Sequence, residues 1–243
     1  HVRSRRQRQM CIRDSDTPVL GVAALAGCIL VYALVGALVQ WRNLPSIVVT
    51  LGMSFVWLGA AVLILPSPGG SAPAWLQAIV KFRTPIVPFA LVASAVLALA
   101  VHLFLMRSSV GTVLRGAGGN PQAMARAGWS LLKVRMSMYA LAGFFGVLAG
   151  LALVGLTTSA DANIALRYTL LSIAGVILGG GEFTGGRISP IGAVIGALTL
   201  TLAGSLLAFL RISPDWQIGA QGAILILVLA LRALVNRAER KSA

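Results

Sequence analysis

The chain has 243 residues, of which 58% are hydrophobic and only 11% are charged. A soluble domain of this length carries about a quarter charged residues, so the composition excludes a soluble globular protein and predicts one integral membrane domain. The net charge of +14 would suit nucleic-acid binding, but the positive residues gather at both ends and between apolar stretches, which is the pattern of membrane topology. We therefore expect no nucleic-acid partner.

Residues 1–15 form a basic head that differs from the rest of the chain. They contain five arginines and one aspartate and show no apolar periodicity. Such a segment is typical of a disordered tail, of the first part of a signal peptide, or of sequence foreign to the protein. The membrane domain is accordingly predicted over residues 16–243.

Seven apolar stretches follow, and each is a candidate membrane span because about 20 residues cross the hydrocarbon core of a bilayer. They are residues 18–39, 46–65, 86–106, 137–156, 169–180, 188–210 and 217–235. The fifth is short unless it begins near Ile164. Residues 74–80 are predicted to lie on the membrane surface as an amphipathic turn or two, with Trp75 at headgroup level. The predicted fold class is all-α, a polytopic transmembrane helix bundle of about seven spans.

Glycines recur four residues apart in three consecutive spans. The pairs are Gly146 and Gly150, Gly175 and Gly179, and Gly192 and Gly196. This spacing puts two small residues on one face of a helix and lets backbones approach closely where lipid removes the hydrophobic driving force. We expect these pairs at helix–helix contacts.

The segment 107–135 carries five basic residues and no acidic one, which places it on the cytoplasmic side of the membrane. Within it, Asn120 is a favoured N-cap, Pro121 suits the first helical position, and Gly128 suits the residue after a helix end. The segment is therefore predicted to be a cytoplasmic loop that contains a short capped helix over residues 121–127. The alternative is a solvated basic loop.

The number of spans decides on which side of the membrane each basic end of the chain lies. With residues 107–135 inside, four later spans return the basic C-terminal tail to the cytoplasm. Counting backwards through three spans puts the head outside, although its five arginines favour the inside. A chain truncated upstream, a foreign head, or both would remove this conflict, and we expect a truncated chain with a non-native head.

A second glycine-rich segment separates the fifth and sixth spans. Its candidates for gating or helix packing are Gly179, Gly180, Glu182, Gly185, Gly186 and Arg187. The two charged residues are expected to pair with each other or with the neighbouring loop. The alternative is a plain cytoplasmic turn in which the glycines permit tight geometry.

The string GAGGNPQAMARAG, followed by an apolar span and then by VILGGGEFTGGRISPIGAVIGAL, resembles the permease subunits of bacterial ATP-binding cassette importers for simple sugars. The resemblance lies within the branched-chain amino acid and sugar permease superfamily and covers roughly residues 44–235. In that family the first string forms a cytoplasmic coupling helix that lies in a groove of the ATPase subunit. The matching residues here are Gly118, Gly119, Asn120, Ala123, Ala125 and Gly128, and the expected coupling site also includes Pro121 and Arg126. Gln122 and Trp129 depart from the usual pattern.

The resemblance implies a permease subunit that moves a small sugar across the bacterial inner membrane, with ATP hydrolysed by a partner. The implied partners are ATPase subunits, a second permease copy, a periplasmic or lipoprotein solute-binding protein that meets the external loops 66–85 and 157–168, and membrane lipids. The sequence contains no Walker A pattern and no catalytic or metal-ligating cluster, so we expect no enzyme active site, cofactor or metal.

Other functions stay open because the coupling segment carries no information about cargo. A branched-chain amino acid or nucleoside permease is the nearest alternative. An ion-driven secondary transporter would need acidic residues within its spans, and none of the six carboxylates lies in the middle of one. A structural membrane protein without transport is a further alternative.

Overall fold

The computed structural model describes residues 17–82, 89–182 and 186–210, together with five isolated positions between 219 and 230. Within these residues the regular secondary structure is helical, and strand-like pairing is confined to an isolated bridge between Gly69 and Ala160. The predicted all-α class is confirmed. The head predicted at 1–15 lies outside the described residues.

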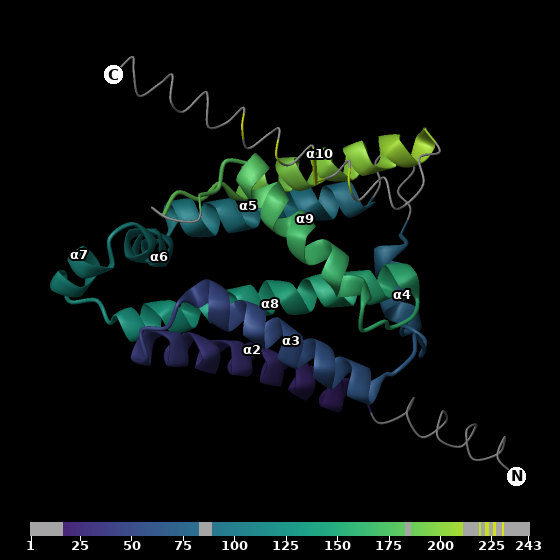
Figure 1. The fold of residues 1–243 in the computed structure, drawn as a ribbon, viewed down its shortest axis with the longest axis horizontal. Coiled ribbons are helices and arrows are strands. Elements are labelled where there is room, and N and C mark those ends of the chain that lie inside the picture. Colours follow the sequence, from purple (N-terminus) through teal and green to yellow (C-terminus); the bar gives the residue numbers. More distant parts are fainter. Residues whose placement is uncertain are drawn as a thin grey trace, which may run out of the picture.

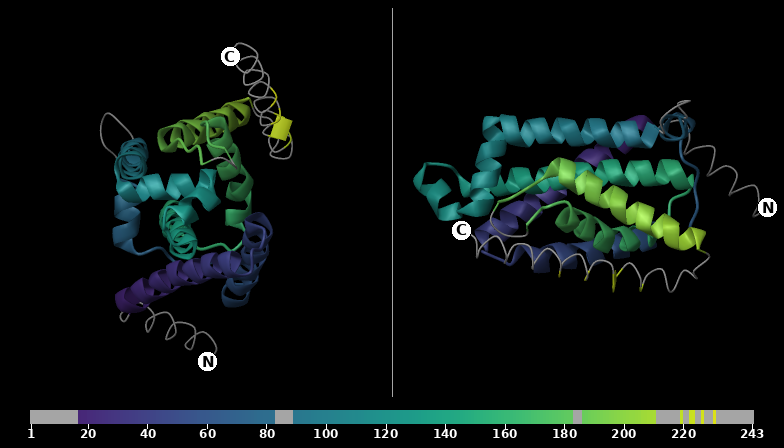
Figure 2. Two further views of the ribbon diagram at one scale, coloured as in Figure 1. Left: turned by 90° about the vertical axis from the view of Figure 1, so that its left-hand side faces the viewer. Right: turned by 90° about the horizontal axis from the view of Figure 1, so that it is seen from above.

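Five helices of the described chain are long and apolar enough to cross a membrane, and Figures 1 and 2 show them in an elongated bundle. They are α2 (Thr17–Trp41), α3 (Ser46–Ile64), α5 (Phe89–Arg107), α8 (Leu131–Thr157) and α10 (Pro190–Phe209). Many of their large apolar side chains are exposed, and α3 has no buried residue. Such a surface is stable in the hydrocarbon of a bilayer or against other apolar helices.

The predicted count of seven spans is not confirmed. Helix α9 (Ile164–Leu178) begins at the residue that the longer alternative required, but its 15 residues are fewer than the about 20 that cross the hydrocarbon core. It crosses the bundle at an incline in Figure 1. The seventh predicted span, residues 217–235, lies outside the described residues except for isolated positions.

One end of the bundle is closed by a short helix and a paired loop. Helix α4 (Ala74–Val80) forms where the amphipathic helix was predicted and packs on α8, since a Cβ added to Gly155 would lie 2.7 Å from Val80 Cγ2. Two backbone hydrogen bonds of 3.0 Å join Gly69 to Ala160. The two loops predicted to be external are thus held together, at the end of the bundle where α4 lies (Figure 1).

Helices α2 and α8 pack closely at two points, and at each point a glycine of one helix faces a tyrosine of the other. A Cβ added to Gly36 of α2 would lie 2.9 Å from Tyr139 Cβ of α8. A Cβ added to Gly143 of α8 would likewise lie 2.9 Å from Tyr32 Cβ of α2. The order of these contacts makes the helices antiparallel. Val39 of α2, three residues after Gly36, has no exposed surface.

Helices α9 and α10 form a hairpin through two opposed glycine pairs. Gly179 and Gly192 approach so closely that a Cβ on either would contact the carbonyl of the other. A Cβ on Gly196 would contact the Gly175 carbonyl in the same way. The packing predicted for these two pairs is confirmed, because only a missing side chain allows backbones this close.

The packing predicted for the third pair is wrong. A Cβ added to Gly146 or Gly150 would meet nothing within 4 Å in the described structure. Helix α8 instead meets α2 through Gly143, one turn earlier. The spacing of four residues identifies a smooth helix face, but it does not identify which face another helix covers.

These contacts predict a difference between two glycines of α8. Gly143→Val inserts a side chain against Tyr32 and is expected to lower the free energy of unfolding by about 1–3 kcal/mol relative to Gly150→Val, the typical cost of overpacking. Both substitutions carry the same helix-propensity cost, so the difference isolates packing. Thermal unfolding of both variants in the same detergent measures it, and equal midpoints would contradict the α2–α8 contact.

Candidate functional site

The basic segment 107–135 is helical over most of its length. It contains α6 (Ser109–Gly119) and α7 (Pro121–Arg126), and α8 begins at Leu131, six residues before the predicted start of the fourth span at Ser137. The predicted loop is therefore much shorter than expected, and the segment contains more helix than the one short helix predicted. Long basic side chains reach water from a helix surface, so positive charge marks the membrane boundary without ending the helix.

Helix α6 was missed by sequence reasoning, although its N-terminus carries a signal. The Ser108 hydroxyl accepts a hydrogen bond of 3.0 Å from the Gly111 N–H, which is an N-cap. Leu114 is only 5% exposed, so one side of α6 is packed. The stretch is rich in glycine, whose helix propensity is low, and packing against the bundle outweighs that preference.

The N-terminus of α7 matches its prediction. The Asn120 Oδ1 accepts a hydrogen bond of 3.0 Å from the Ala123 N–H, and Pro121 occupies the first helical turn. The cap satisfies one of the backbone donors that a helix start leaves unpaired. The predicted role of Asn120 as a cap is confirmed.

The C-terminus of α7 is closed by a Schellman motif. Gly128 has φ of 84°, and its N–H donates to the Ala125 carbonyl at 3.0 Å. The Trp129 N–H donates to the Met124 carbonyl at 3.1 Å. This pair of bonds satisfies carbonyls at the helix end, and the left-handed φ explains a glycine at position 128.

Helix α7 is folded back on α6 by one side chain and exposes the others. A Cβ added to Gly116 would lie 2.8 Å from Met124 Sδ, so this methionine anchors the helix. The exposed residues of α7 are Pro121, Gln122, Ala123, Ala125 and Arg126. Trp129, just beyond, is 50% exposed. Figure 1 shows α7 at the end of the bundle opposite to α4.

The two glycine-rich strings meet at a point that we call the glycine junction, formed by Gly118, Gly119 and Gly186. Gly186 has φ of 71°, and a Cβ on it would lie 2.8 Å from the Gly119 nitrogen and would collide with the Arg115 carbonyl oxygen. A Cβ on Gly118 would lie 3.2 Å from Gly186 Cα. The sequence predicted both strings as sites but did not predict that they touch.

Glu182 and Arg187, the two charged residues of the second glycine-rich string, pair with each other, which is one of the two predicted arrangements. Arg187 Nη1 lies 3.6 Å from Glu182 Oε1, and the Glu182 N–H donates to the Arg187 carbonyl at 3.2 Å. The Arg187 side chain is 80% exposed, so solvent screens the ion pair and the backbone bond closes the turn. Gly179 packs in the α9–α10 hairpin and Gly180 follows α9, whereas Gly185 lies outside the described residues.

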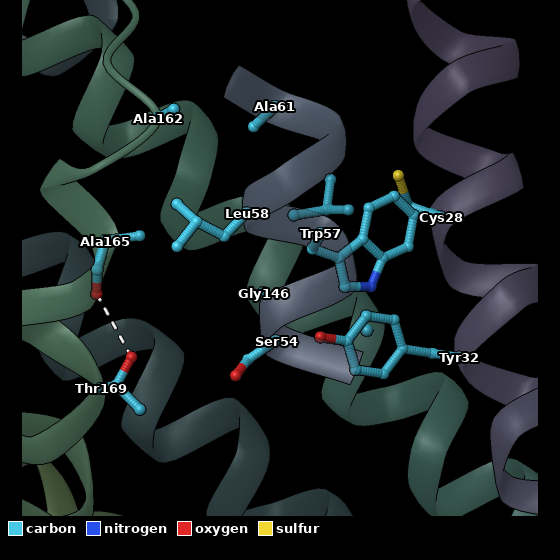
Figure 3. Close-up of a pocket in the computed structure, with 12 residues that line it drawn as sticks. Cys28, Tyr32, Ser54, Trp57, Leu58, Ala61, Gly146, Ala162, Ala165 and Thr169 are labelled. Atoms are coloured by element: carbon cyan, nitrogen blue, oxygen red, sulfur yellow. Dashed lines mark hydrogen bonds between the residues drawn. The ribbon is translucent and has the colours of Figure 1, made fainter. Parts of the chain in front are cut away.

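A cavity of about 360 Å³ lies between α2, α3, α8 and the beginning of α9 (Figure 3). Its lining is Cys28, Tyr32, Ser54, Trp57, Leu58, Ala61, Gly143, Gly146, Val147, Ala162, Ala165 and Thr169. Sequence reasoning did not find this cavity. Its residues come from four separate segments, and none of these segments has a local pattern that marks it.

The fold defines the class of the protein as a multi-pass helical membrane protein with a short, capped and exposed helix, α7, at one end. The sequence profile of the family described as the branched-chain amino acid transport system / permease component matches residues 7–229. The chain belongs to this family.

Named relatives of this chain are import permeases. The galactose/methyl galactoside import permease protein MglC of Haemophilus influenzae is 26% identical over 89% of this chain and 67% of that protein. The fructose import permease protein FrcC of Rhizobium meliloti is 28% identical over 90% of this chain and 62% of that protein. The autoinducer 2 import system permease protein LsrC of Escherichia coli is 29% identical over 92% of this chain and 67% of that protein.

The chain spans 62–67% of the length of these relatives. No solved structure matches it.

The glycine junction predicts that alanine is costly at position 186. Gly186 and Gly70 both have positive φ, but only a Cβ at Gly186 meets neighbouring atoms. Gly186→Ala is expected to lower the free energy of unfolding by about 1–3 kcal/mol more than Gly70→Ala. Both variants strain the backbone, but only Gly186→Ala also overpacks its surroundings. Unfolding of the purified chain in detergent measures the difference, and an equal loss in both variants would contradict the junction.

Proposed function

We propose that the chain is the membrane-spanning permease subunit of an ATP-binding cassette importer for a small sugar, with ATP hydrolysed by a separate subunit. Helix α7 is the observation that carries this proposal. A helix of six residues is unstable in isolation, yet this one is capped at both ends and exposes five of its residues. Such a rigid, exposed element suits docking into a groove of a partner protein. The names of two relatives, which import galactose and fructose, support a sugar as cargo.

The end of the bundle that carries α7 is assigned to the cytoplasm of a bacterial cell, with the spans in the inner membrane. The five basic residues of segment 107–135 and its lack of acidic residues support this orientation. The basic C-terminal tail is assigned to the same side. Under this assignment α7 faces the compartment that contains ATP.

The other partners follow from the remaining surfaces. The bridged loops around Gly69 and Ala160, at the external end, are proposed to meet a solute-binding protein. Helix α3, which has no buried residue, and the other exposed apolar faces are proposed to contact lipid and a second permease copy. Closure of two ATPase subunits would move both copies of α7, and the attached spans would tilt as rigid bodies.

The Asn120 cap supplies a test of α7 in the full-length protein, assembled with its ATPase and binding protein in vesicles. Asn120→Ala removes the cap, whereas Asn120→Asp keeps an acceptor that caps equally well. ATP-dependent uptake of labelled galactose, fructose or ribose is expected to fall about fivefold in Asn120→Ala, the factor for about 1 kcal/mol of lost capping energy. Asn120→Asp is expected to retain uptake.

Two outcomes would contradict the proposal. Unchanged uptake and unchanged ATPase co-purification in Asn120→Ala would show that α7 does not couple to the ATPase. Uptake of labelled leucine without uptake of any sugar, measured in the same vesicles, would instead favour the branched-chain amino acid alternative.

A further inference from the structure

The cavity between α2, α3, α8 and α9 lies near the middle of the membrane-spanning helices. Tyr32, Ser54 and Gly143 all line it, and each stands close to the midpoint of its own helix. From there the cavity extends toward the end of the bundle that carries loop 157–168, because Ala162 of that loop also lines it. Its volume of about 360 Å³ is at the lower end of the range for ligand pockets, which suits a small solute.

One wall of the cavity is aromatic. The rings of Tyr32 and Trp57 are stacked, with centroids 6.4 Å apart and planes 7° from parallel. Flat aromatic rings combine a large apolar area with a polar atom at one edge. A pyranose or furanose has the same division, since its C–H groups form an apolar face and its hydroxyls project from the edge. Figure 3 shows both aromatic side chains in this wall, beside Cys28.

The cavity also offers hydrogen-bonding groups that are not used up within the protein. The Ser54 hydroxyl donates to the Leu51 carbonyl at 2.6 Å, and the Thr169 hydroxyl donates to the Ala165 carbonyl at 3.3 Å. Each oxygen keeps lone pairs that accept from a ligand. The Tyr32 hydroxyl makes no hydrogen bond within the described residues and keeps both its donor and its acceptor capacity. Figure 3 shows it directed toward the side of the cavity where Ser54 lies.

None of the described side chains that line the cavity belongs to an aspartate, glutamate, lysine, arginine or histidine. A zwitterionic amino acid would lose the hydration of two charges there without a charged partner, which is costly in a membrane interior. A neutral solute with several hydroxyls loses only hydrogen bonds, which Ser54, Thr169 and Tyr32 can replace. The described part of the lining thus favours a neutral sugar over an amino acid.

We propose that this cavity binds one neutral monosaccharide on its way through the membrane. The aromatic pair contacts the apolar face of the sugar, and the hydroxyls of Tyr32, Ser54 and Thr169 bond its edge. Transport of the sugar rests on the proposed function, whereas binding in the cavity depends on the chain itself. The importer proposal and the cavity proposal can therefore be contradicted independently of each other.

Cys28 reports binding without any ATPase. In a full-length chain with Cys11→Ser, reconstituted in lipid nanodiscs, the rate at which a small maleimide labels Cys28 reports access to the cavity. Galactose, fructose or ribose at high concentration is expected to slow labelling by about tenfold when the cavity is mostly occupied. Leucine at the same concentration is expected to leave the rate unchanged. Labelling that no sugar slows, or that leucine slows equally, would overturn the proposal, and protection only by added lipid would assign the cavity to an acyl chain.

Gly146 supplies a second test because a side chain fits there without a clash. A Cβ at Gly146 or at Gly150 meets nothing within 4 Å, but only Gly146 lines the cavity. Gly146→Leu fills the cavity, and the matched Gly150→Leu makes the same change one turn further along α8. In the assembled transporter, Gly146→Leu is expected to reduce sugar uptake by about tenfold or more, the loss for a ligand that no longer fits, while Gly150→Leu retains it.

The outcomes separate the site from the function. Uptake that is equal in Gly146→Leu and Gly150→Leu, whether both are active or both inactive, would overturn the cavity as the sugar site while leaving the importer proposal intact. An absence of sugar uptake by the unmodified assembly would contradict the importer proposal. In that case, protection of Cys28 by sugar would still support the cavity.

Discussion

The contact between Gly186 and the C-terminal end of α6 is the constraint that ties the α6–α7 pair to the turn between α9 and α10. Met124 anchors α7 on α6, and α6 meets the turn between α9 and α10 at the glycine junction. Opposed glycines then join α9 to α10, and the beginning of α9 forms one wall of the cavity through Ala165 and Thr169. The contacts from α6 to α10 are largely between backbones, so no flexible side chain absorbs a displacement there. A movement imposed on α7 therefore has a continuous physical path to the cavity.

The bundle depends on close backbone contacts because it buries little apolar surface of its own. Only eight apolar residues of the described chain are buried, and many large apolar side chains face outward. Hydrocarbon covers such side chains as well as another helix does, so burial supplies little force for packing in a bilayer. What distinguishes one arrangement from another is how closely two helices approach. Glycine at the α2–α8 and α9–α10 contacts sets that distance.

The sequence predicted the features that depend on neighbouring residues. The caps of α7 were found because an asparagine side chain and a left-handed glycine act within a few residues of their own positions. The α9–α10 contact was found because four-residue glycine spacing defines a helix face. Helix α6 was missed because packing of its buried side outweighs the glycines that argue for a loop. The same glycine spacing failed for Gly146 and Gly150, since only the fold decides which face is covered.

The cavity marks the limit of what a local pattern can predict. Tyr32 and Trp57 stand in two different apolar spans, where each is indistinguishable from a packing residue until the helices are brought together. The start of α8 shows a related limit. Lys133 and Arg135 suggested that the apolar span begins only after them, but the helix extends through both residues back to Leu131, since long basic side chains are compatible with a helix surface.

Cross-linking tests most directly whether α7 is the element that receives work from an ATPase. Ala123 of α7 and Ala78 of α4 are both exposed alanines, at opposite ends of the bundle (Figure 1). In the assembled complex, Ala123→Cys is expected to cross-link to the ATPase subunit with a yield that changes when ATP binds, and Ala78→Cys is expected not to cross-link to it. Equal yields from both positions, or no product from Ala123→Cys, would contradict the assignment of α7 as the coupling helix.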